Sequence, residues 1–278
     1  MSARERKERL DLLLAERRPD LSRSRIQAEI MAGNVIVNGR VSDKPGTLHD
    51  SSVEINLRKP ENPYVSRGGL KIEGALHELQ IDVRGLVVLD VGSSTGGFTD
   101  CLLKKGAKFV FTLDVGYGQL DQSLRNDSRV TVMERFNIRN LTRSDLDRLP
   151  DLAVVDVSFI SLSKVLPVLS KLTIPAVLAL IKPQFEAGRI DAGKGKGVIR
   201  DPELHRRILK DTLDMACRAG YCFRDITFSR WPGPKGNIEY FAYFDFNRKS
   251  GCSCREDYTG CIDRAVVQAH HELLGKKN

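Results

Sequence analysis

The fold of this chain is decided by the stretch Val87-Val88-Leu89-Asp90-Val91-Gly92-Ser93-Ser94-Thr95-Gly96-Gly97-Phe98-Thr99-Asp100. Its branched apolar residues predict a strand over 87–91 that is buried on both faces. A glycine-rich turn follows, and residues 98–105 predict a short helix. A strand, a glycine turn and a helix in this order form the first half of a nucleotide-binding βα unit, in which backbone N–H groups can approach a ligand closely.

The spacing of the glycines restricts which ligand the turn can hold. It is G-x-x-x-G-G, whereas a dinucleotide pyrophosphate requires G-x-G-x-x-G. The turn therefore favours a single nucleoside over a dinucleotide. A tight βα connection without a ligand is the alternative that this stretch leaves open.

The rest of residues 65–278 continues the same pattern. Strand-like and helix-like segments alternate, which predicts an α/β fold, Rossmann-like, with a mostly parallel sheet and helices on both faces. The expected strands are 87–91, 108–113, 130–133, 152–157, 176–181, 222–228 and 239–246, and the expected helices are 66–79, 98–105, 202–219 and 262–274.

Residues 1–59 predict a small α+β domain, and the two prolines within 60–64 predict a linker behind it. Helices are expected from Leu10 and from Ser22, and Asn38-Gly39 predicts a hairpin. Five arginines could contact an RNA backbone from the helices: Arg9, Arg17, Arg18, Arg23 and Arg25. The segments 9–11, 22–24 and 33–39 resemble the RNA-binding domain named after ribosomal protein S4; a charged, solvated helix pair is the alternative.

Composition indicates a basic globular protein. The 278 residues carry a formal charge of +8, which favours a polyanionic partner such as nucleic acid. No apolar run approaches the roughly 20 residues that cross a bilayer, and the N-terminus lacks the apolar region of a signal peptide. We therefore expect a cytoplasmic protein that does not enter membranes.

Six cysteines raise the question of a metal site. Cys252, Cys254 and Cys261 form C-x-C-x6-C, but a fourth ligand is missing unless His270 or His271 folds back. We expect unpaired thiols and no metal.

Polar residues follow the expected strands where a nucleoside would need them. Asp90, Asp114 and Asp156 end strands, and Asn137 follows a fourth, so all four would lie at one edge of the sheet; each could instead be a helix cap or a turn residue. A site for one nucleoside without a pyrophosphate predicts S-adenosylmethionine. The expected cofactor-binding residues are Asp90, Gly92, Ser93, Ser94, Gly96, Gly97, Phe98, Asp114 and Asn137.

The turn after the fourth strand concerns the methyl acceptor. It reads Asp156-Val157-Ser158-Phe159 and lacks the prolines typical of enzymes that methylate base amino groups. A hydroxyl acceptor instead needs a base or a cationic environment. Lys182, which ends a buried strand, could provide it with Lys71 as its neighbour, and Asp156 and Glu239 could orient both amines; snorkelling surface lysines are the alternative.

Five segments together resemble the TlyA family, also called hemolysin A-like proteins: 66–71, 89–99, 156–162, 182–186 and 236–240. The resemblance implies an FtsJ-like catalytic domain that methylates ribose 2′-hydroxyls of ribosomal RNA, with cytidine as the nucleoside and ribosomal RNA or subunits as partners. It also implies a catalytic tetrad of Lys71, Asp156, Lys182 and Glu239. The alternatives are a haemolytic or pore-forming protein, an RNA-binding assembly factor without catalysis, and a methyltransferase for transfer RNA or an mRNA cap.

Overall fold

The structure is a computed structural model that describes residues 7–21, 23–31, 33–57, 62–187, 197–246 and 258–275. The chain divides into two compact units, Met1–Pro63 and Tyr64–Asn278. Residues 60 and 61 of the predicted linker lie outside the described residues, as does Ser22, the predicted start of the second helix.

The first unit is a small α+β domain. Its core consists of Leu10 and Leu14 from α1, Ile26 and Ile30 from α2, and residues of β2. The Asn38-Gly39 turn joins β2 to β3, and the positive φ angles of both residues confirm the predicted hairpin. The elements are β1 Lys7–Arg9, α1 Leu10–Arg17, α2 Arg23–Met31, β2 Val35–Val37, β3 Arg40–Val41, β4 Leu48–Asp50 and β5 Ile55–Leu57.

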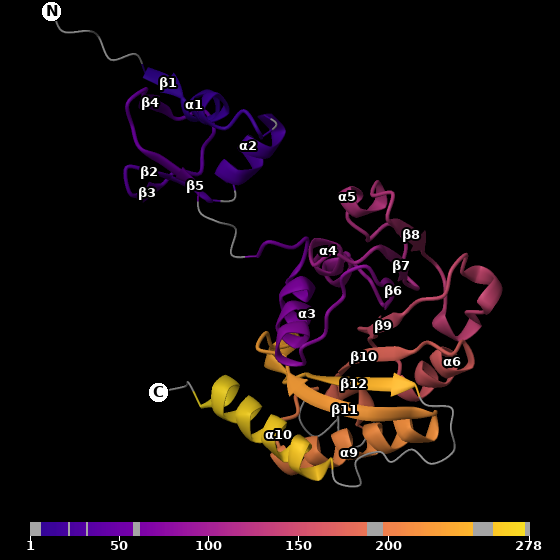
Figure 1. Ribbon diagram of the computed structural model, residues 1–278. Coiled ribbons are helices and arrows are strands. Elements are labelled where there is room, and N and C mark those ends of the chain that lie inside the picture. Colours follow the sequence, from indigo (N-terminus) through magenta and orange to yellow (C-terminus); the bar gives the residue numbers. More distant parts are fainter. Residues whose placement is uncertain are drawn as a thin grey trace, which may run out of the picture. The chain divides into compact units, whose positions relative to one another are not determined.

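The second unit contains a seven-stranded sheet in the order β11-β12-β10-β9-β6-β7-β8 (Figure 1). β12 is antiparallel to both of its neighbours, β10 and β11, and the other pairs of neighbouring strands in this sheet are parallel. The predicted α/β fold with a mostly parallel sheet is therefore confirmed. The strands are β6 Val87–Val91, β7 Phe109–Leu113, β8 Val130–Met133, β9 Leu152–Val155, β10 Ala176–Ile181, β11 Tyr221–Phe228 and β12 Tyr240–Phe246.

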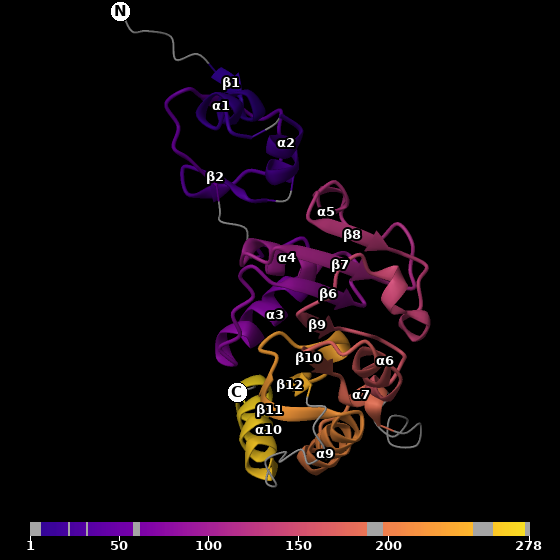
Figure 2. The same ribbon diagram turned by 45° about the vertical axis from the view of Figure 1, so that its right-hand side comes forward.

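Helices cover both faces of the sheet. Side chains of the buried strands alternate between the two faces, so each face presents apolar side chains that helices bury. On one face, Val88 packs with residues of α3, α4 and α5. On the other face, Leu89 and Val91 belong to the cluster that includes α6, α9 and α10 (Figure 2). The helices are α3 Arg67–Glu78, α4 Gly97–Lys104, α5 Gln122–Arg125, α6 Leu166–Lys171, α7 Pro183–Glu186, α9 Pro202–Arg218 and α10 Thr259–Leu274.

The strand order creates a crevice. The chain proceeds from β6 to β7 on one side and reaches β9 on the other side, so the direction of winding reverses between β6 and β9. Ligands of open α/β sheets bind at such a point, outside the carboxyl ends of the strands.

The prediction of unpaired thiols is wrong for Cys222, which is disulfide-bonded. Sequence spacing could not give this pairing, since a disulfide depends on the distance between two Cβ atoms. Cys101 and Cys261 are free and buried, and Cys252 and Cys254 lie outside the described residues. Within the described ranges, no group of three or more His, Cys, Asp or Glu side chains could hold a metal ion.

Candidate active site

The glycine turn after β6 needs glycine for steric reasons. Gly92 has a φ of +88°, and a Cβ atom there would lie 2.5 Å from the backbone oxygen of Asp156. Gly96 has a φ of +93°, and its Cβ would lie 2.3 Å from a methyl group of Leu124. Side chains at these positions would be strained and would push the turn away from β9 and α5. The turn is thus held close to the end of β9.

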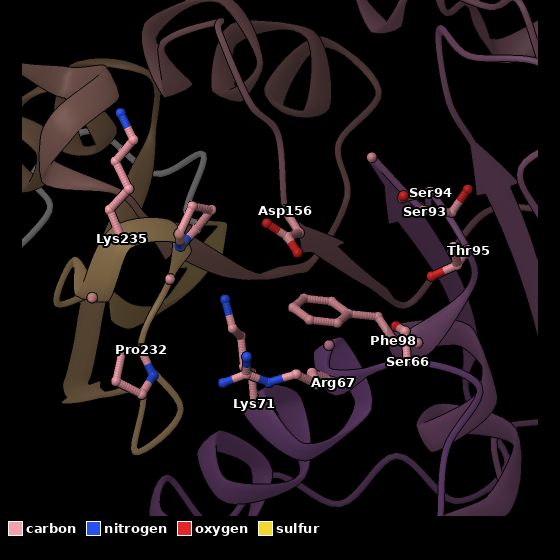
Figure 3. A pocket seen from close by; sticks show the side chains of 16 residues that line it. Ser66, Arg67, Lys71, Ser93, Ser94, Thr95, Phe98, Asp156, Pro232 and Lys235 are labelled. Atoms are coloured by element: carbon pink, nitrogen blue, oxygen red, sulfur yellow. The ribbon is translucent and has the colours of Figure 1, made fainter. Parts of the chain in front are cut away.

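Two cavities adjoin this turn. The first has a volume of about 740 Å³ and lies between the turn, the start of α3 and the loop 232–236 (Figure 3). The second, of about 600 Å³, lies between the turn and the loops after β7, β8 and β9. The cavities share Gly92, Ser94 and Asp156. An elongated ligand could therefore lie across the turn with one end in each cavity.

Most of the predicted cofactor-binding residues line these cavities. Ser93, Gly97 and Phe98 line the first and Asn137 lines the second, together with the shared Gly92 and Ser94. Asn137 also caps the short helix Ile138–Asn140, so the helix-cap interpretation holds for it as well. Gly96 lines neither cavity.

Asp114 lines the second cavity and is held by the backbone. Its two carboxylate oxygens accept hydrogen bonds from the N–H groups of Ser94, at 2.8 Å, and Gly116, at 2.7 Å. A carboxylate oxygen can accept more than one hydrogen bond, so each oxygen retains the capacity to accept one from a ligand hydroxyl.

Asp90 lies beneath the turn and lines neither cavity. It is completely buried and accepts a hydrogen bond of 2.6 Å from the Thr99 hydroxyl. Burial raises the pKa of its carboxyl group to about 7, and the nearby Asp156 carboxylate acts in the same direction. Asp90 therefore supports the turn from below.

The four predicted tetrad residues form two ion pairs. Lys71 Nζ lies 2.6 Å from Glu239 Oε2, and Lys182 Nζ lies 2.6 Å from Asp156 Oδ1. Lys71 and Asp156 line the first cavity (Figure 3). Glu239 is fully buried, and Lys182 is 8% exposed.

Sheet topology explains why residues so distant in sequence meet here. Asp156 directly follows β9 and Lys182 directly follows the parallel strand β10, so both lie at the carboxyl edge of the sheet. Glu239 directly precedes β12, which is antiparallel to β10 and pairs Tyr240 with Ile181. The start of β12 is thus brought to the same edge.

Comparison with known proteins places this site in a family. The sequence profile of the FtsJ-like methyltransferase family matches residues 64–246. The chain belongs to this family. The profile of the S4 domain matches residues 8–55 of the same chain.

Relatives of this FtsJ-like protein carry two kinds of name. The chain is 44% identical to the 16S/23S rRNA (cytidine-2′-O)-methyltransferase TlyA of Mycobacterium tuberculosis, over 86% of this chain and 90% of the relative. It is 45% identical to Hemolysin A of Brachyspira hyodysenteriae, over 80% of this chain and 93% of the relative. A solved structure described as a "putative hemolysin" from Streptococcus thermophilus has a TM-score of 0.74 at 38% identity, covering 98% of this chain and 99% of the other. Among the described residues, no helix is long and apolar enough to cross a membrane.

Sequence reasoning missed the residues that support the two ion pairs of this FtsJ-like site. The Ser158 hydroxyl accepts a hydrogen bond of 2.9 Å from Lys182 Nζ, and Gln184 donates one of 3.4 Å to Glu239 Oε1. Gly233 packs against the same carboxylate, since a Cβ atom there would lie 2.0 Å from Glu239 Oε1. Ser158 and Gln184 each lie two residues after a tetrad residue, but that spacing alone carries no signal of their contacts.

The predicted RNA-binding arginines of the S4 domain divide into three groups. Arg9 and Arg23 lie 2.9 and 4.0 Å from the carboxylate of the buried Asp11, and the hydrogen bonds from Arg9 are the largest cause that lowers the pKa of this carboxyl to about 2. Arg17 donates hydrogen bonds to two backbone carbonyl groups of its own domain, and Arg18 pairs with Asp20. The side chain of Arg25 lies outside the described residues.

Proposed function

We propose that this FtsJ-like methyltransferase transfers a methyl group from S-adenosylmethionine to the 2′-hydroxyl of a cytidine in ribosomal RNA. The observation that carries the proposal is the pair of lysine–carboxylate ion pairs at the cavity beside the glycine turn. Such a site offers two ammonium groups to a developing alkoxide.

The cavities fit S-adenosylmethionine in size and in chemistry. Asp114 would accept hydrogen bonds from the ribose hydroxyls with its remaining lone pairs, and Asn137 lines the same second cavity. The methionine part would extend past Gly92 and Ser94, which line both cavities, into the first cavity. When bound, the cofactor supplies an electrophilic methyl group on a sulfonium.

The tetrad residues would prepare the acceptor. A neutral hydroxyl is a weak nucleophile, so a base or a cation must favour its alkoxide form. Lys182 would take the proton of the 2′-hydroxyl or stabilise the oxygen that loses it, while Asp156 and Ser158 hold its Nζ in place. Lys71, held by Glu239, would add a second positive charge beside the same oxygen.

Four observations favour a hydroxyl of ribosomal RNA as the methyl acceptor. The N-terminal unit matches the S4 domain profile, and the whole chain carries a net charge of +8. A relative with 44% identity is named as a methyltransferase of 16S and 23S rRNA. The turn after Asp156 also lacks the prolines typical of enzymes that methylate base amino groups.

The test is to map 2′-O-methylated positions in ribosomal RNA from cells with and without the protein, and then to restore the methyl group in vitro. Purified protein and labelled S-adenosylmethionine should methylate ribosomal subunits from the deficient cells. Lys182→Ala should lower the rate by roughly 10²–10⁴-fold, the usual contribution of a general base, without weakening cofactor binding. Lys108→Ala is the control, because Lys108 is exposed and precedes β7 at the opposite edge of the sheet. An unchanged methylation map, or full transfer by Lys182→Ala, would refute the proposal.

A further inference from the structure

Two cations of the first cavity are not used by the tetrad. Arg67 and Lys235 line this cavity and are exposed. Lys71 in the same cavity is neutralised by Glu239, and Lys182 by Asp156. Among the described residues, no acidic side chain lies within ion-pairing distance of Arg67 or Lys235. The cavity thus presents two uncompensated positive charges to whatever enters it.

Arg67 is placed by α3 on the same face as Lys71. The two residues are four positions apart, and residues so spaced are neighbours on a helix surface, about 6 Å apart along the axis. Figure 3 shows both side chains on one side of the cavity. An anion bound by Arg67 would therefore lie about one helical turn from the ammonium group that faces the methyl acceptor.

Lys235 is placed by the loop that leads into β12, on the side of the cavity away from the glycine turn (Figure 3). Its φ of +58° is unusual for a residue with a side chain. The loop is fixed by the buried Asn237, whose amide group donates to the carbonyl groups of Gly197 and Pro234 and accepts from the N–H of Ile199. Gly233 of the same loop packs against Glu239. The position of Lys235 is thereby coupled to that of the tetrad.

We propose that Arg67 and Lys235 bind the phosphate groups that flank the target nucleotide. This inference rests on the proposed function, in which a ribose 2′-hydroxyl lies between Lys71 and Lys182. The carbon next to the 2′-position carries the oxygen of the 3′-phosphodiester, so a ribose held there brings a phosphate to the same cavity. Arginine and lysine bind phosphates readily, and Lys235 lies on the side of the cavity opposite the glycine turn (Figure 3).

The experiment measures how salt affects the binding of unmethylated ribosomal RNA from cells that lack the protein. Each phosphate contact contributes about 0.7–0.9 to the slope of log K against log salt concentration. Arg67→Gln and Lys235→Gln should each reduce the slope by about that amount and the double variant by about twice as much. The affinity for S-adenosylmethionine, measured by calorimetry, should not change.

Matched controls exist at the opposite edge of the sheet. Arg218 and Lys108 are both exposed: Arg218 is the last residue of α9, shortly before β11, and Lys108 immediately precedes β7. Arg218→Gln and Lys108→Gln should leave the slope unchanged; an equal decrease in the controls would overturn the proposal, because the effect would then be one of net charge.

Two further outcomes would also overturn it: an unchanged slope in the site variants, or weaker cofactor binding by Arg67→Gln, which would assign Arg67 to the carboxylate of the cofactor. These outcomes can be distinguished from a failure of the proposed function. That function fails if the unaltered protein transfers no methyl group, whereas the slopes report on RNA binding alone.

Discussion

Replacing Lys71 by methionine should destabilise the catalytic unit far more than the loss of one surface charge. Lys71→Met keeps most of the side-chain length but removes the ammonium group 2.6 Å from Glu239. Glu239 is fully buried, and the only other side-chain hydrogen bond described for it is the 3.4 Å bond from Gln184. The substitution therefore leaves a buried carboxylate without a counter-charge.

The size of the effect follows from this burial. Removing one partner of a buried ion pair costs about 3–5 kcal/mol, because the remaining charge stays desolvated. For a domain of this size, 1 kcal/mol corresponds to about 2–4 °C in the melting temperature. Lys71→Met should thus lower the melting temperature of the catalytic unit by roughly 6–20 °C.

Thermal unfolding of a set of variants tests this reasoning. The double variant Lys71→Met/Glu239→Gln removes both charges and should recover most of the lost stability, while neither variant should transfer methyl groups. Lys105→Met is the control, because its pair with Glu73 is 42% and 36% exposed and should contribute less than about 1 kcal/mol. If Lys71→Met unfolded at the same temperature as Lys105→Met, or if the double variant were no more stable than the single one, the reasoning would be refuted.

Three further predictions concern the turn and two buried titratable groups. Gly92→Ala should lower the free energy of unfolding by at least about 1–2 kcal/mol because of its positive φ, and it should weaken cofactor binding in calorimetry. Gly74→Ala in α3 is the contrast, because a Cβ there meets no atom within 4 Å. In denaturant unfolding, Gly74→Ala should raise the free energy of unfolding by about 0.5–1 kcal/mol. Because the pKa of Asp90 is raised, its contribution to stability is complete below pH 3.8 and is lost as the pH rises through about 7. In melting curves between pH 4 and 8, the melting temperature of Asp90→Asn should therefore rise relative to that of the unaltered protein as the pH increases. A constant difference between the two melting temperatures would contradict the assignment. Burial lowers the pKa of His205 to about 4 from 6.5, with the neighbouring His270 acting in the same direction and Asp201 opposing it, so its contribution is complete above pH 6.5 and is lost as the pH falls through about 4. The stability of His205→Asn should therefore rise relative to that of the unaltered protein as the pH falls from 7 to 4. If both proteins lost stability equally in acid, the titration of His205 would not be the cause of that loss.

The sequence predicted the strands well where burial leaves few options. The runs 87–91 and 176–181 coincide with β6 and β10, because strands covered on both faces need continuous apolar residues. The run 130–133 also coincides with β8, a half-buried strand at the edge of the sheet. The expected strand 152–157 ends two residues earlier, at Val155. Asp156 and Val157 already belong to the turn that Gly92 approaches closely, and a sequence pattern does not reveal such a contact.

The chemistry of the site was predictable from residue types, but its pairing was not. Acidic residues at strand ends and a lysine in an apolar context point to one edge of a sheet. The pairing of Lys71 with Glu239 depends on the register of β12 against β10, and that of Lys182 with Asp156 depends on the register of β10 against β9. Short polar contacts such as that of Ser158 depend on rotamers, which the sequence does not fix.

Arg17 illustrates the opposite difficulty in the S4 domain. Its place in a cluster of basic residues suggested RNA binding, yet it donates hydrogen bonds to the carbonyl groups of Ser51 and Val53. Arginine provides five donors in a fixed geometry and suits backbone carbonyl groups as well as phosphates. Composition alone does not distinguish these partners.

The insertion of β12 between β10 and β11, in the direction opposite to the other strands of the seven-stranded sheet, has a consequence for synthesis of the protein. The glycine turn, both lysines and Asp156 are all made before residue 183, but the carboxylate that balances Lys71 arrives 168 residues after it. A nascent chain that has completed β10 therefore still has an unpaired edge and an unbalanced ammonium group. We expect the enzyme to acquire the paired geometry of its active site only when almost the entire sheet has been assembled, so that a truncated chain with an intact glycine turn would be unable to modify its substrate.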